Sequence, residues 1–105
     1  MFQNLKQMKK GWFIGDFDPS VYRTSKFEVG FHRYSKGCKT IDHFHEKSTE
    51  INVVISGRMI VNGEVAKKDD IFIFDPNVVS RTEFLEDTEL IVVRTASVPN
   101  DKVVI

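Results

Sequence analysis

The chain has 105 residues, the size of one ordinary domain, and its 15 basic residues balance its 15 acidic residues. This zero net charge argues against binding to nucleic acid or to an anionic membrane surface, because both depend on an excess of Lys and Arg. The longest uninterrupted apolar runs contain four residues, so no spanning helix or secretory signal core is expected. The single cysteine, Cys38, excludes an internal disulfide and a four-thiolate metal site, and a reducing cytoplasm is the expected location.

The apolar residues are mostly of the kinds that favour strands. The sequence has 13 Val, 9 Ile and 9 Phe, against 3 Leu and 2 Ala. Branched and aromatic side chains suit a pleated, half-buried surface, whereas Leu and Ala favour helices. The composition therefore predicts an all-β domain.

Short strands are predicted one after another along most of the chain. Residues 1–25 are expected to form an N-terminal arm, helical or loose over 1–10, followed by a cover segment around Trp12-Phe13-Ile14. Asn62-Gly63 is the commonest two-residue hairpin signal, because both positions must accept a positive φ. Residues 96–105 are expected to be a C-terminal tail. The spacing of the strands is typical of a sandwich or a small barrel, and they cover residues 26–34, 40–45, 50–56, 58–61, 65–66, 71–74, 81–84 and 89–95.

Two histidines that are two residues apart, His43 and His45, are the strongest signal of chemistry. On a strand they point to one face, roughly 6–7 Å apart along the chain, so both imidazoles can approach one ion. Glu50 begins the next predicted strand after a polar turn, and a hairpin or corner there would bring its carboxylate to the same point. Two His and one carboxylate form the ligand set of many Fe, Mn, Ni or Zn sites. The alternative is a solvated strand face, but Ile41 shares the face of both histidines and favours an inward orientation.

The spacing of these residues resembles the first signature of the cupin superfamily. All five fixed positions of that signature are present, in the order Gly37, five residues, His43-Phe44-His45, four residues, Glu50, six residues, Gly57. The resemblance implies that His43, His45 and Glu50 are metal ligands and that the two glycines are turn residues. It also implies one cupin-type domain over residues 1–105, whose barrel over 26–95 is a small antiparallel double-stranded β-helix, or jelly roll.

The second signature of the same family is degraded. In the best register, its positions for Gly, Pro, Gly, His and Asn are occupied by Asp69, Asp75, Asn77, Ser80 and Phe84. Asp69 and Asn77 can still replace turn glycines, because Asp and Asn tolerate a positive φ better than other residues with a side chain. Ser80 stands at the family's third ligand histidine, a possible fourth-ligand position at which a neutral hydroxyl is a poor ligand. Three ligands then remain, and the open position could be taken by His32, Glu83, water or a substrate oxygen.

Four further residues are candidates for lining a substrate site. Asn52 shares the strand face of the candidate carboxylate ligand, and His32 could line the barrel mouth as an acid or base. Tyr34 and Arg58, like Arg94, lie on predicted strands and could hold a carboxylate or phosphate. The alternative for each of them is an ordinary solvated strand face.

The opposite face of the strand that begins with Glu50 carries Ile51, Val53 and Ile55. If Glu50 points into the barrel, this apolar row points outward, and monomers rarely leave such a row exposed. The row is therefore expected to be covered, either by Trp12-Phe13-Ile14 or by a second subunit. We predict a homodimer with this face near the interface.

Three hypotheses for the function follow from these observations. The first is a small metal-dependent enzyme, in which a divalent transition metal binds and polarises a small oxygen-rich metabolite or binds dioxygen beside it. The resemblance leaves oxygenase, isomerase and lyase chemistry open. The second, favoured by the degraded second signature, is a non-catalytic cupin that binds a sugar or another small molecule. The third is a structural barrel without metal, against which the intact His43, His45 and Glu50 argue.

Overall fold

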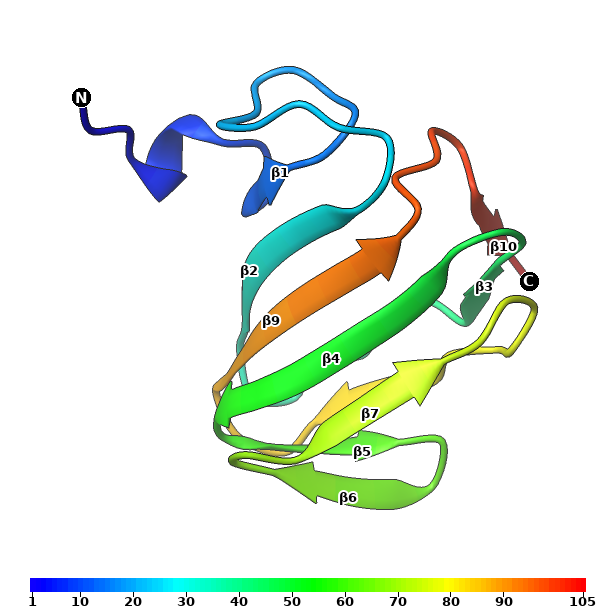
Figure 1. The fold of residues 1–105 in the computed structure, drawn as a ribbon. Helices are drawn as coiled ribbons and strands as arrows, with labels where there is room; N and C mark the ends of the chain where they lie inside the picture. The colour runs from blue at the N-terminus through cyan, green and yellow to red at the C-terminus, as the bar shows by residue number, and fades with distance from the viewer.

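The computed structural model describes all of residues 1–105 and contains ten strands but no α-helix (Figure 1). A single 3-10 turn, η1 (Leu5–Gln7), lies in the N-terminal arm and begins with a capping box at Asn4. The strands are β1 (Trp12–Ile14), β2 (Glu28–Tyr34), β3 (His43–His45), β4 (Thr49–Ser56), β5 (Arg58–Val61), β6 (Glu64–Lys67), β7 (Ile71–Phe74), β8 (Thr82–Phe84), β9 (Thr88–Thr95) and β10 (Lys102–Val104).

The strands form two walls. One wall is a five-stranded sheet with the order β1-β2-β9-β4-β7, and it faces the viewer in Figure 1. The other wall consists of the pair β10-β3 and the triplet β6-β5-β8, which are joined by isolated bridges between His43 and Ser80 and between Lys39 and Glu83. Every strand pair is antiparallel, and apart from β1 and β2 no neighbours within the large sheet are consecutive in the chain. The predicted all-β jelly-roll barrel is therefore confirmed.

Both ends of the chain differ from their predictions. Residues Trp12–Ile14 form β1 at the edge of the large sheet, paired with β2. Residues Lys102–Val104, which lie in the predicted tail, form β10 and pair along the whole of β3. The predicted strand 40–45 begins only at His43, and Ile41 before it is 63% exposed. Ile41 was thus the wrong reason to expect an inward face for the two histidines.

The tight turns use the residues that the sequence indicated. Asn62 and Gly63, between β5 and β6, have φ values of 46° and 86°, as a two-residue hairpin turn requires. Asp69 and Asn77 have φ values of 74° and 69°, so each stands in the left-handed region that a glycine would otherwise supply. The expected replacement of two turn glycines by Asp and Asn is therefore confirmed.

The core is at one end of the barrel. Alternate residues of β4 point inward, and they change from Glu50 through Asn52 to Val54 along the strand. Val54 belongs to a cluster of buried apolar side chains from five strands, namely Val54, Met59, Ala66, Phe84, Leu90 and Val92. The other end of the barrel has polar side chains in the equivalent inward positions.

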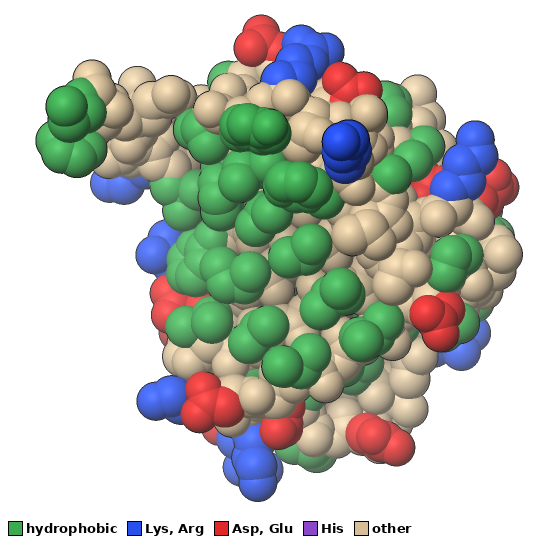
Figure 2. Space-filling model, in the orientation of Figure 1, with side chains coloured by type: hydrophobic (Ala, Val, Ile, Leu, Met, Phe, Trp, Pro, Cys, Tyr) green, Lys and Arg blue, Asp and Glu red, His purple; other side chains and the backbone are tan.

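The outer face of the large sheet is apolar and uncovered. Ile51, Val53 and Ile55 of β4 point to this face, as predicted, and cross-strand neighbours on β7 and β9 extend it. Ile55, Ile71 and Ile73 are 40%, 64% and 57% exposed. Figure 2 shows the resulting apolar patch, which has few charged side chains among its members. The N-terminal segment extends the sheet edge and does not cover this face, so the first of the two predicted covers is wrong.

No helix in the structure has the length and apolar character needed to cross a bilayer.

Candidate functional site

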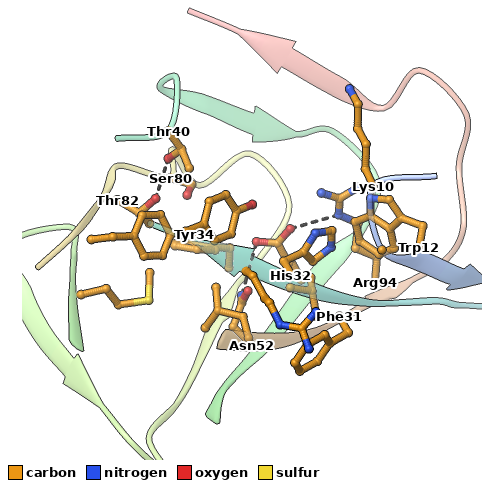
Figure 3. Close-up of a pocket in the computed structure, with 18 of the residues that line it drawn as sticks. Lys10, Trp12, Phe31, His32, Tyr34, Thr40, Asn52, Ser80, Thr82 and Arg94 are labelled. Atoms are coloured by element: carbon orange, nitrogen blue, oxygen red, sulfur yellow. Dashed lines mark hydrogen bonds and ion pairs between the residues drawn. The ribbon is translucent and has the colours of Figure 1, made fainter. Parts of the chain in front are cut away.

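The two walls enclose a cavity of about 890 Å³. Its volume is in the range of sites that bury small molecules. Both walls and the N-terminal arm contribute to it, including β1, β2, β3, β4, β7, β8 and β9. Seven of the candidate site residues line the cavity, namely His32, Tyr34, His43, Glu50, Asn52, Ser80 and Arg94. Figure 3 shows several of these side chains directed towards the same space.

The candidate ligands His43 and His45 are both buried on the inner face of β3. Their ring centroids are 5.4 Å apart, with the rings nearly perpendicular. Nδ1 of His43 lies 2.6 Å from the carbonyl oxygen of Ile41. If Nδ1 carries the proton and donates to that oxygen, Nε2 is left with a free lone pair, which is the usual arrangement of a histidine that binds metal.

His45 is the least satisfied polar side chain of the site. Both of its ring nitrogens are buried without a hydrogen-bond partner in the chain. Its Nε2 lies 3.7 Å from Oε1 of Glu50, and its Nδ1 lies 4.0 Å from Oδ2 of Asp101. Burial, reinforced by the positive charge of Arg94, lowers the pKa of His45 to about 4, although the charge of Glu50 opposes this shift. The imidazole is therefore neutral at physiological pH, the form that ligates metals.

Glu50 is held by two neighbours that the ligand hypothesis did not include. Arg94, directly opposite on β9, donates from Nε to Oε1 over 3.0 Å. Asn52 donates from Nδ2 to Oε2 over 3.3 Å. Arg94 also contacts Glu28 at 3.5 Å and stacks its guanidinium on the ring of Trp12, 4.6 Å from the centroid. The carboxylate is thus neutralised by a guanidinium, and no three His, Cys, Asp or Glu side chains in the structure are arranged to hold one ion.

Ser80 lies directly beside the candidate ligands. Its backbone N–H donates to the carbonyl oxygen of His43 over 2.7 Å, and the N–H of His43 donates back over 3.4 Å. Ser80 is buried, lines the cavity and forms a bridge with His43. This place agrees with the position that the resemblance gives to a third histidine. Its short hydroxyl leaves that position open.

The two protein groups proposed to replace Ser80 lie elsewhere. Glu83 does not line the cavity, and its side chain is at the surface, where it pairs with Lys39 at 3.9 Å. This alternative is therefore wrong. His32 projects from β2 on the opposite wall, between Trp12 at 4.7 Å and Tyr34 at 6.3 Å between ring centroids. It lines the cavity but belongs to an aromatic row that continues from Tyr34 to Phe84, 4.2 Å apart.

The environment of His32 is tightly defined. Its Nε2 is buried without a partner, and burial together with the charge of Arg94 lowers its pKa to about 4. The neighbouring residue on the same strand face is Gly30, where an added Cβ would lie 2.6 Å from Nε2 of His32 and 2.8 Å from the Trp12 ring. Only glycine therefore allows these two rings to pack over β2. The alternative of a surface histidine is wrong for His32.

Arg58 is not part of the site. It precedes Met59 on β5, and because successive strand residues point to opposite faces, the burial of Met59 places Arg58 outside. Its guanidinium is exposed and lies 3.9 Å from the carboxylate of Glu86. The prediction that Arg58 lines the substrate site is therefore wrong.

Asp101, in the predicted tail, was missed. Its carboxylate accepts hydrogen bonds from the backbone N–H groups of Lys47 and Ser48, at 3.0 and 2.9 Å, and so fixes the turn between His45 and Glu50. Burial works to raise the pKa of Asp101, but these hydrogen bonds and the nearby His45 outweigh it, so the pKa lies below its usual range. Nothing local in the sequence distinguishes this Asp from other exposed turn residues.

No protein-family model and no curated protein sequence matches the chain, whereas solved structures do. KdgF from Halomonas sp. matches with a TM-score of 0.66 and 22% identity, over 72% of this chain and 75% of that protein. A conserved protein with a double-stranded β-helix domain from Klebsiella pneumoniae matches with a TM-score of 0.68 and 24% identity, over 80% and 78%. The DMSP lyase DddQ from Ruegeria pomeroyi matches with a TM-score of 0.72 and 11% identity, over 87% of this chain but 48% of that protein.

These similarities concern the fold. Together with the strand order, they show that the chain has a double-stranded β-helix fold. The fold expected from the first signature is confirmed.

Proposed function

We propose that the barrel binds a divalent transition metal through His43, His45 and Glu50 and takes a small oxygen-rich molecule into the adjoining cavity. The observation that carries this proposal is His45, a neutral imidazole with both nitrogens buried and unpartnered, 3.7 Å from the Glu50 carboxylate. A buried polar group without a partner is costly, and an ion is a partner that both residues can share.

The donor set suits Fe, Mn, Ni or Zn, because it combines two imidazoles with one carboxylate. A bound ion would supply Lewis-acid polarisation of a substrate oxygen. The position beside Ser80 stays open to such an oxygen, since no protein ligand reaches it. Asp101 holds the turn between His45 and Glu50, and its carboxylate lies 4.0 Å from Nδ1 of His45, the ring nitrogen on the side away from Glu50. A carboxylate on that side can orient an imidazole that binds metal.

Arg94 competes with a metal for Glu50. The guanidinium of Arg94 already balances the charge of the carboxylate, and it would repel a divalent cation that approached the same carboxylate. The affinity of the site for metal is therefore expected to be modest, and the metal-free barrel is stabilised by its own ion pair.

The catalytic hypothesis is favoured over a non-catalytic binding module by the open position beside Ser80 and the polar groups around it. The similarity to DddQ, a lyase by its name, supports small-molecule chemistry on this fold. Oxygenase, isomerase and lyase reactions all remain within the proposal. The binding module is kept as the second candidate on one observation, the occupation of Glu50 by Arg94.

We also propose that the chain is a homodimer that buries the apolar outer face of β4, β7 and β9. This face is nearly uncharged, so an identical face can pack on it without bringing like charges together (Figure 2). The expected compartment is a reducing one such as the cytoplasm, because the single cysteine, Cys38, is exposed and unpaired.

Thermal unfolding with and without metal tests the proposed site. Protein stripped with chelator is expected to melt at a higher temperature after addition of Mn²⁺, Fe²⁺, Ni²⁺ or Zn²⁺, because an ion that binds only the folded state stabilises it. The shift should disappear in a His43→Ala/His45→Ala double variant and persist in His32→Phe, which removes a histidine of the same cavity. Equal shifts in the wild type and the double variant, or no shift with any ion, would contradict the proposal. Circular dichroism verifies that each variant is folded.

A further inference from the structure

The cavity is positively charged, although the chain as a whole is neutral. Only one acidic residue, Glu50, is among the residues that line it. Five basic residues line the same cavity, Lys6, Lys10, Arg33, Arg94 and Lys102. Because 15 basic and 15 acidic residues are available in the chain, this distribution is a property of the cavity and not of the composition.

Three of these basic side chains have no acidic partner. Arg33 pairs with Glu89 at 2.9 Å, but Lys6, Lys10 and Lys102 take part in no ion pair. Lys6 lies on η1 and Lys10 lies in the turn that leads into β1. Lys102 pairs with His45 across the β10–β3 ladder, so it shares the strand face of the candidate ligands. The N-terminal arm and the C-terminal strand thus bring unpaired positive charge to one cavity.

Arg94 adds a directional donor to this charge. A guanidinium has five N–H groups, and those of Arg94 contact Glu50 from Nε and Glu28 from Nη1. The remaining N–H groups have no partner in the chain, and the side chain is 21% exposed and lines the cavity. Figure 3 shows Arg94 beside Trp12, with Lys10 above them. A planar guanidinium with free donors is suited to a carboxylate.

A row of rings crosses the cavity. Trp12, His32 and Tyr34 follow one another on the large sheet, Phe84 of β8 continues the row on the other wall, and Phe72 also lines the cavity. This aromatic row favours a ligand with a flat apolar body, while the cations favour a negative charge at its end.

We propose that the cavity is specific for small organic carboxylates, with the carboxylate held by the free N–H groups of Arg94 and attracted by the unpaired lysines that line the cavity, and with the body of the molecule lying along the aromatic row. The proposal rests on the proposed function in one respect, since it names the substrate class of the same cavity. It does not need a bound metal, because the cationic and aromatic groups belong to the chain.

Trp12 provides a direct readout, because it is the only tryptophan of the chain and stacks on Arg94. Metal-free protein in excess chelator is titrated with benzoate, 1-naphthoate and hexanoate, each beside its neutral amide, while tryptophan fluorescence is recorded. At least one carboxylate is expected to bind saturably and at least about tenfold more tightly than its amide, since one charge-assisted hydrogen bond of this kind contributes roughly that factor. The affinity should fall as salt is added. If every amide binds as well as its carboxylate, or no probe binds, the proposal is overturned.

Substitutions of single lysines test whether the carboxylate binds in this cavity. Lys10→Gln and Lys102→Gln are each expected to weaken carboxylate binding about two- to fivefold. Lys68→Gln, at an exposed lysine outside the cavity in the turn between β6 and β7, is the matched control and should have no effect. Equal loss in all three would indicate only a general charge effect and would contradict the assigned position. Inorganic phosphate is the competing anion, and displacement of the carboxylate by phosphate at equal concentration would overturn the carboxylate assignment.

The same titration separates this proposal from the metal site. In excess chelator no ion is bound, so the expected preference for a carboxylate over its amide depends only on the cations and the aromatic side chains of the chain. If carboxylates bind but no metal shifts the melting temperature, the carboxylate proposal stands and the proposed metal site is refuted. If a metal shifts the melting temperature but carboxylates are not preferred over their amides, the metal site is supported and the carboxylate proposal is overturned.

Discussion

The two ends of the barrel are built from the same strands but differ in the kind of side chain that fills their interior. Along β4 and β9, cross-strand partners change from Val54–Leu90 to Asn52–Val92 and then to Glu50–Arg94. The first pair belongs to the packed apolar core, and the last is a buried ion pair. Between Val54 and Glu50, the interior therefore changes from apolar side chains, which stabilise the fold by burial, to charged side chains, which need a partner of opposite charge.

The unsatisfied groups are confined to the polar end. The three buried side-chain atoms without a hydrogen-bond partner are Nε2 of His32 and both ring nitrogens of His45. Burial also raises the pKa of Glu28 at this end, although its contact with Arg94 opposes the shift. The apolar end therefore provides the stability that allows the polar end to keep groups available for a ligand.

Among the changes that test this comparison, truncation of a core side chain is expected to have the largest effect on the free energy of unfolding. Phe84 is almost fully buried at the apolar end, and Phe84→Ala should lower the free energy of unfolding by about 3–5 kcal/mol, through lost burial and the cavity left behind. Urea denaturation measures the change. Ile73→Ala, on the exposed outer face, is the control and should cost much less. Equal losses at the two sites would mean that the apolar end is not the stabilising region.

Removal of Arg94 is expected to be the largest change at the polar end. Arg94→Gln leaves Glu28 and Glu50 without their cation, and breaking a buried pair in this way costs up to about 3 kcal/mol. The deficit should grow with pH above about 4.5, the ordinary pKa of Glu, because the pKa of Glu28, already raised by burial, would rise further without Arg94.

The same variant should bind metal more tightly, because the guanidinium no longer competes for Glu50. Isothermal titration with Mn²⁺ or Zn²⁺ measures this change. A weaker metal affinity in Arg94→Gln than in the wild type would show that Arg94 supports the site instead of competing with it.

Acid should destabilise the fold through His32 by a smaller amount. Its pKa is about 4 in the fold against an ordinary value of 6.5, so the neutral form is the one that the fold stabilises. This contribution is complete above pH 6.5 and is lost as the pH falls towards 4. In chelator-treated protein, His32→Phe is expected to unfold with a shallower dependence on pH over this interval. An unchanged slope would indicate that His32 is protonated without cost.

A charge on the outer face should have the smallest effect on the fold and a clear effect on assembly. Ile73 is 57% exposed and lies within the apolar patch, so Ile73→Lys is expected to leave monomer stability nearly unchanged. Light scattering should give a dimer mass for the wild type and a monomer mass for the variant. A monomeric wild type at micromolar concentration would refute the proposed homodimer.

The fold and part of the site could be predicted because their signals are local. Strand alternation, the hairpin at Asn62-Gly63 and the spacing of His43, His45 and Glu50 all lie within short stretches of sequence. The register that aligns Ser80 with the family's third histidine is matched by its bridge to His43.

The remaining features depend on contacts between distant segments. The Arg94–Glu50 pair joins residues 44 positions apart, and Asp101 reaches the amide of Ser48 across 53 positions. Neither partner could be chosen without the order of strands in the sheets. Arg58 was misplaced for a related reason, since its direction depends on which face of β5 the core covers.

Metal content is the most direct test of the central claim. Untagged wild-type protein and the His43→Ala/His45→Ala variant are dialysed to equilibrium against Fe²⁺, Mn²⁺, Ni²⁺ or Zn²⁺, and the metal on both sides of the membrane is measured by plasma mass spectrometry. We expect close to one ion per chain in the wild type for at least one metal, and none in the variant. The absence of bound metal from both proteins under every condition would contradict the account, and Arg94 would then be the permanent counter-charge of Glu50.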